Sequence, residues 1–157
     1  MHSVTFIFYF LIFSIIAGIL GALAMNFFMR WMSSITDQKF DMIEALGTLI
    51  TGSEEGASRV GNWAHLISGI FFGMIYTLLM VAIKPHGLPL SLFLGLGFGF
   101  IHGLIVSYLL MFYIAEKHPS EKYREATLPI GFIHMLGHVI YGLVVGLVVG
   151  LAPGITY

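Results

Sequence analysis

The chain contains no cysteine among its 157 residues. This absence excludes disulfide bonds, thiolate metal ligands and iron–sulfur clusters held by cysteine. Charged residues are also scarce, at 10% of the chain, against roughly 25% in an average soluble domain. A chain that is 58% hydrophobic has too few polar side chains to cover a water-facing surface. The composition therefore indicates a membrane protein.

Four long stretches lack any charged residue, namely 1–29, 60–83, 85–115 and 126–157. A helix needs about 20 apolar residues to cross roughly 30 Å of hydrocarbon, and each stretch is long enough. We therefore predict an all-α polytopic membrane protein, in which four transmembrane helices form an up-down bundle and a single domain. The predicted spans are 4–30, 60–83, 90–115 and 128–151. No Lys or Arg precedes Arg30, and the first stretch is longer than the apolar core of a signal peptide, so we expect this helix to be kept.

The loop after the first span contains the sequence FDMIEALGTLI. Its apolar residues Phe40, Ile43, Leu46 and Ile50 recur at helical spacing, whereas the acidic residues fall off that face. We predict a short amphipathic helix over 40–51 that lies at the membrane interface.

The Lys and Arg residues are distributed unevenly over the predicted loops, and cytoplasmic loops are enriched in these residues. Lys84 alone falls in the second loop, whereas the other six basic residues border or lie in the first and third loops. We therefore expect a location in the inner cell membrane, with both termini outside and the first and third loops in the cytoplasm. The net charge of -1 and the lack of a basic face give no indication of nucleic-acid binding. The six basic residues that border or lie in the first and third loops are Arg30, Lys39, Arg59, Lys117, Lys122 and Arg124.

A family resemblance rests on two features, the loop segment DMIEALG and the glycine and histidine at the start of the next helix, in GNWAH. In these features the chain resembles an uncharacterised family of small four-helix membrane proteins of prokaryotes. The resemblance covers the first two predicted spans and the loop between them. It implies the four-helix topology and no activity.

Glycines recur at four-residue spacing in three of the predicted spans, so each set lies on one helix face. Small residues allow close van der Waals contact between helices in a membrane. We expect these faces to hold the bundle together or to contact another membrane subunit or a second copy. Glycines could also leave room for a flat ligand such as a porphyrin. The glycines are Gly69, Gly73, Gly95, Gly99, Gly103, Gly142, Gly146 and Gly150.

Four histidines fall inside the predicted spans, where an ionisable side chain is costly and indicates a functional role. With a rise of 1.5 Å per residue, His65 and His134 lie about 9 and 14 Å from the nearest cytoplasmic charge. His138 and His102 lie about 20 and 21 Å deep by the same measure. We therefore expect a shallow pair and a deep pair that face the bundle interior, and we expect His118, in the third loop, to be solvated.

Three hypotheses account for these histidines. In the first, neutral imidazoles form hydrogen bonds to Asn26, to Ser and Tyr side chains or to backbone carbonyls, and stabilise the bundle. In the second, two facing histidines bind haem b, through His102 with His138 or His65 with His134. In the third, the imidazoles bind copper or another transition metal, and neighbouring methionine thioethers favour Cu(I). The methionines concerned are Met25, Met29, Met32 and Met135.

The chain contains no nucleophile elbow, phosphate-binding loop or HExxH motif. We therefore expect no enzymatic activity. The sequence favours a non-catalytic accessory subunit of a larger membrane complex, whose partners are the lipid bilayer and other membrane subunits or a second copy. The alternatives are a haem-binding electron carrier and a protein that binds or transports copper or another transition metal. Co-purification with larger membrane subunits distinguishes the first hypothesis, and an absorption spectrum distinguishes the second.

Overall fold

The computed structural model describes residues 2–36, 41–85, 87–124, 127–153 and 155. All regular secondary structure among these residues is helical. Four helical stretches are long and apolar enough to cross a membrane, which confirms the predicted all-α fold with four spans. Three of the spans are single helices, α1 (His2–Ile35), α3 (Ala57–Ile83) and α6 (Leu128–Leu151).

The third span is built from three consecutive helical segments, α4 (Leu88–Leu104), η1 (Ile105–Leu110) and α5 (Met111–Glu116). The segment η1 is a π-helix, a widened turn that often occurs at functional sites. It begins three residues after His102. Both α4 and α6 carry a proline in their first turn, where the missing N–H has no helical partner to lose.

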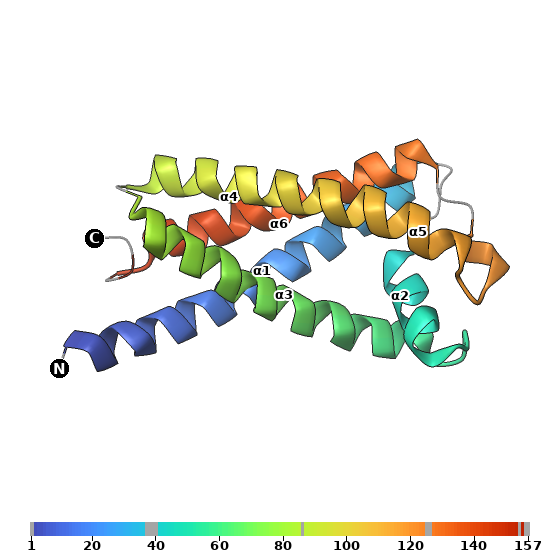
Figure 1. Cartoon of the computed structure of the whole chain (residues 1–157), viewed down its shortest axis with the longest axis horizontal. Coiled ribbons are helices and arrows are strands. Elements are labelled where there is room, and N and C mark those ends of the chain that lie inside the picture. Colours follow the sequence, from blue (N-terminus) through green and yellow to red (C-terminus); the bar gives the residue numbers. More distant parts are fainter. Residues whose placement is uncertain (1, 37–40, 86, 125–126, 154, 156–157) are drawn as a thin grey trace.

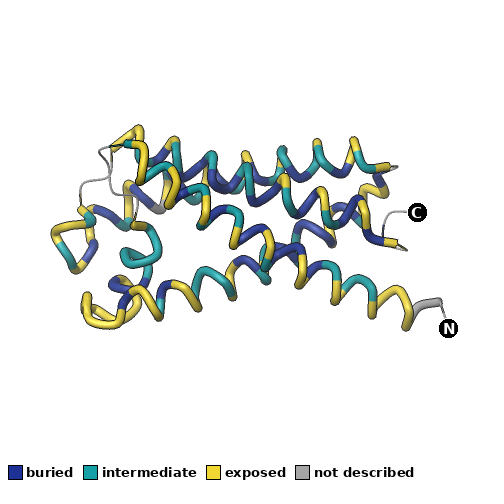
Figure 2. Tube along the Cα trace, turned by 180° about the vertical axis from the view of Figure 1, so that it is seen from behind, coloured by how far each residue is buried: buried dark blue, intermediate teal, exposed yellow. Residues whose placement is uncertain are grey.

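The four spans are arranged so that α4 packs on α6, α6 on α1, and α1 on α3 (Figure 1). The N- and C-terminal ends lie at one end of the bundle, and α2 and α5 lie at the other. Buried residues follow the inner faces of the helices, whereas the outward faces are exposed (Figure 2). The exposed faces are rich in large apolar side chains, as expected for helices in contact with lipid.

The predicted glycine faces lie at the contacts between helices. A methyl group on Gly95 would overlap the carbonyl oxygen of Gly142, and a methyl group on Gly142 would overlap that of Gly95. Gly99 and Gly103 approach the backbone carbonyls of His138 and Met135 in the same way. The backbones of α4 and α6 are therefore in direct contact along this interface.

Glycines of α3 and α6 complete these interfaces. Gly69 and Gly73 of α3 lie against the backbone of Gly18 on α1. At the far end of α6, Gly146 meets the carbonyl oxygen of Ser91, and Gly150 meets the Ser91 side chain. Each of the eight glycines singled out in the sequence thus lies where a neighbouring helix leaves no room for a side chain.

The first loop contains the helix α2 (Met42–Thr51), within the predicted range 40–51, of which residue 40 lies outside the described residues. The Asp41 side chain accepts a hydrogen bond of 3.1 Å from the Glu44 N–H and caps the helix. Gly52 ends it with a φ of 72°, a left-handed conformation that favours glycine. Gly47 allows α2 to contact the backbone of Ala57 on α3, so α2 packs across the start of that span. Its position at the membrane surface stays a prediction.

Candidate functional site: a histidine cluster inside the bundle

The intramembrane histidines come from three helices. His134 and His138 lie one helical turn apart on α6, and each is only 9% exposed. The ring centroids of these two imidazoles are 5.0 Å apart. The His102 ring, on α4, lies 4.5 Å from the His138 ring. The deep pair expected from the sequence is therefore in direct contact, and His134 extends it to a row of three imidazoles.

Tyr76 on α3 fixes the orientation of His102. A hydrogen bond of 3.1 Å joins the Tyr76 hydroxyl to Nδ1 of His102. The Phe72 ring packs against the same imidazole, with 4.0 Å between ring centroids. With Nδ1 occupied, Nε2 is the nitrogen of His102 that is left for another partner. In a metal-binding histidine, one ring nitrogen usually forms a hydrogen bond, and this bond orients the second ring nitrogen towards the metal.

Three imidazole nitrogens of these four histidines are buried and have no hydrogen-bond partner among the residues that the structure describes, namely His65 Nδ1, His134 Nδ1 and His138 Nε2. Leaving a buried polar atom without a partner costs about 1–3 kcal/mol. The purely structural hypothesis predicted hydrogen bonds from these side chains to neighbouring polar groups. Tyr76 provides such a partner to His102, whereas the Ser107 hydroxyl, one of the partners expected from the sequence, is itself buried and unpaired.

His65, the fourth of these histidines, lies on α3. It also lines a cavity of about 210 Å³ between α1 and α3, together with Asn26 and Asn62. The lining of this cavity is mostly apolar, and His65, Asn26 and Asn62 provide its polar side chains.

Beyond the cluster, towards the termini, the interior is filled by aromatic side chains. The Tyr141 hydroxyl donates a hydrogen bond of 2.6 Å to the Gly69 carbonyl oxygen. Its ring packs edge-on against Tyr76, which in turn packs edge-on against Phe98. The next layer is the contact between Gly95 and Gly142. On the side of the termini, the cluster is thus covered by packed aromatic side chains and close helix contacts.

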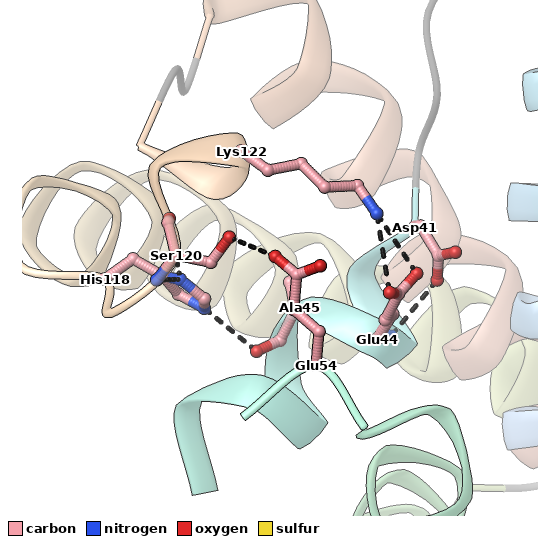
Figure 3. Close-up of polar contacts among 7 residues, drawn as sticks. All are labelled: Asp41, Glu44, Ala45, Glu54, His118, Ser120 and Lys122. Atoms are coloured by element: carbon pink, nitrogen blue, oxygen red, sulfur yellow. Dashed lines mark hydrogen bonds and ion pairs between the residues drawn. The ribbon is translucent and has the colours of Figure 1, made fainter. Parts of the chain in front are cut away.

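The third loop corrects one expectation from the sequence. His118 was expected to be solvated, but it is only 3% exposed. Its Nε2 is hydrogen-bonded to the Ala45 carbonyl oxygen of α2 at 3.0 Å (Figure 3). Its backbone carbonyl oxygen accepts a hydrogen bond of 2.7 Å from Arg124 Nε. The contact with α2 could not be predicted from the sequence, because α2 and the third loop meet only in the tertiary structure.

Two further contacts attach this loop to the first loop (Figure 3). Ser120 donates a hydrogen bond of 2.6 Å to Glu54, and Lys122 forms an ion pair with Glu44 at 3.3 Å. The side chains of Tyr123 and then Glu44 raise the pKa of Lys122 above its usual value. Together these contacts form a polar cap over the end of the bundle that lies opposite the termini.

No protein-family model matches this chain, and neither the curated proteins nor the solved structures give a match.

Proposed function

We propose that this protein binds a late first-row transition-metal ion inside its helix bundle, through the imidazoles of His102, His134 and His138 with His65 beside them. The observation that carries this proposal is the row of three neighbouring imidazoles, in which His134 Nδ1 and His138 Nε2 are buried and have no hydrogen-bond partner among the described residues. A metal ion accepts the lone pairs of such nitrogens and removes the cost of leaving them unpaired. Imidazole is a ligand suited to copper, zinc, nickel and iron.

The spacing of the rings supports a shared ion. With a metal–nitrogen distance of about 2.0 Å, two imidazoles on one tetrahedral ion have ring centroids about 5 Å apart. The two ring pairs of the cluster, at 4.5 and 5.0 Å, are close to this value. Among the described residues, no three His, Asp or Glu side chains already surround a common point. Metal binding therefore includes rotation of the imidazoles about their side-chain torsions.

The packing supports haem binding between His102 and His138 less well than it supports a single metal ion. Two axial histidines lie on opposite sides of the iron, which places their ring centroids about 6 Å apart at a metal–nitrogen distance of about 2.0 Å. The rings of His102 and His138 are closer than this and in contact. The backbones of α4 and α6 also meet at Gly99 and Gly103, where a porphyrin needs space.

The proposal concerns binding and not transport, because aromatic side chains and the contact between Gly95 and Gly142 fill the interior beyond the cluster. It is compatible with a role as an accessory subunit, which stays a prediction from the sequence.

Metal titration of the purified protein tests the proposal. The protein in mild detergent is first stripped with a chelator and then titrated with Co(II), Zn(II) or, without oxygen, Cu(I), against a competing chelator. We expect about one equivalent to bind to the wild type, and a loss of affinity of at least tenfold in His134→Gln and His138→Gln. We expect weaker binding at acidic pH, because imidazole must be deprotonated to act as a ligand.

His118→Gln is the matched control, since it removes one buried imidazole outside the cluster. It should bind metal as the wild type does. The proposal is overturned if the wild type binds none of the three ions, or if the two cluster variants bind as tightly as the wild type does.

A further inference from the structure

Two methionines of α1 lie against α6 beside the histidine cluster. A methyl group on Gly137 would lie 3.2 Å from Met25 Cγ and 3.3 Å from Met29 Sδ. Gly137 stands between His134 and His138 in the sequence. Met25 and Met29 are 3% and 6% exposed. Because Gly137 has no side chain, both thioethers reach the α6 backbone at the level of the two buried imidazoles.

A third buried methionine, Met135, follows His134 directly on α6. The surroundings of the cluster therefore combine neutral nitrogen ligands with neutral, polarisable sulfur. Thioethers are soft ligands that select Cu(I) over harder divalent ions. Zn(II) and Co(II) do not gain comparably from thioether sulfur.

The lack of charged ligands around the site also favours Cu(I). Asp and Glu are absent from 60–83 and 128–151 and from α4, so no carboxylate on these helices balances the charge of a bound metal. The cost of transferring an ion from water to an apolar interior grows with the square of its charge, so a divalent ion costs about four times as much as a monovalent one. A site made of neutral imidazoles and thioethers in an apolar bundle therefore favours a monovalent cation.

We infer that the metal of this site is Cu(I), and that Met25 and Met29 provide sulfur ligands beside the imidazoles of His134 and His138. This inference rests on the proposed metal-binding function and specifies its ion. The coordination is a ligand exchange in which the copper stays Cu(I), so no oxidant or reductant takes part.

The test compares metals in methionine variants. Met25→Leu, Met29→Leu and the double variant conserve the side-chain volume, which a packed core tolerates well. Their affinities for Cu(I), measured without oxygen against a chromogenic Cu(I) chelator, are compared with their affinities for Zn(II) and Co(II). Met80→Leu is the matched control, because Met80 is fully buried in α3, outside the cluster.

We expect the double variant to bind Cu(I) at least about tenfold more weakly and to keep its affinity for Zn(II) and Co(II). Met80→Leu should bind all three ions as the wild type does. X-ray absorption of the Cu(I) form should show sulfur among the nearest neighbours of copper in the wild type, and nitrogen alone in the double variant.

The outcomes separate the two proposals. If the wild type binds none of the three ions, the metal-binding function itself is wrong. If the histidine variants lose metal while the methionine variants keep full Cu(I) affinity and copper has no sulfur neighbour, the inference about methionine is wrong and the histidine site remains. A loss of affinity for all three ions in the methionine variants also overturns the inference, because it indicates that the residues act through packing.

Discussion

At the scale of single residues, the pairing of Tyr76 with His102 decides which imidazole nitrogen faces the cluster. The hydrogen bond occupies Nδ1 of His102, and the Phe72 ring holds the imidazole from the side. Sequence position alone could not pair these residues, since they are 26 positions apart on different helices. In the proposed metal site, Tyr76 is thus a positioning residue, which acts through His102.

We expect Tyr76→Phe to weaken metal binding about 10- to 100-fold, the usual effect of removing a hydrogen-bond partner of a metal-binding histidine. The control is Tyr141→Phe, which removes the hydrogen bond to Gly69 and leaves His102 paired. Metal competition and thermal unfolding in detergent are measured for both variants. Equal losses of metal affinity in the two variants would show that Tyr76 acts on packing only.

At the scale of elements, the phase of α6 places His134, His138 and Gly142 on one face, because positions four apart are neighbours on a helix. The same face meets α4, so the imidazoles and the close backbone contact occupy one interface. The sequence predicted this shared face correctly from spacing. It did not single out Gly137, whose role depends on Met25 and Met29 of α1 lying opposite it.

Gly142→Ala should destabilise the contact between α4 and α6, because the added methyl group overlaps the Gly95 carbonyl oxygen. Overpacking of this kind costs about 1–3 kcal/mol. Gly97→Ala is the control, because Gly97 lies on the same span as Gly95 and has open space around its Cα. Unfolding of both variants by a denaturing detergent measures the effect, and a Gly142→Ala protein as stable as the Gly97→Ala protein would contradict it.

At the scale of the whole molecule, the four spans and the polar cap give the bundle two different ends. The termini lie at one end, and α2 with the third loop lies at the other (Figure 1). The described basic residues of the first and third loops lie at the capped end, so we expect this end to face the cytoplasm.

The absence of cysteine makes this orientation easy to test. Glu55→Cys places a thiol at the capped end, and Lys84→Cys places one at the end that carries the termini; both residues are exposed. A membrane-impermeant maleimide should label Lys84→Cys in intact cells and Glu55→Cys only after permeabilisation. The opposite pattern would reverse the orientation, and labelling of both from outside would contradict the span between them.

The sequence predicted the fold class well because the length and apolarity of a membrane span are local properties. The predicted fourth span, 128–151, coincides with the helix α6, and the helix that contains the first predicted span, 4–30, continues to Ile35. His118 was placed wrongly because its burial depends on α2, which is far away in sequence.

By itself the sequence determined that the chain forms four apolar spans, because hydrocarbon accepts only backbone whose hydrogen bonds are satisfied within the helix. It also determined which small and polar residues share a face, because that follows from the helical repeat. Only the tertiary structure decided that His102 meets His138, that Tyr76 holds His102, and that Met25 and Met29 reach Gly137. These meetings depend on how the helices are rotated and shifted against one another, and close glycine contacts between helices set that geometry.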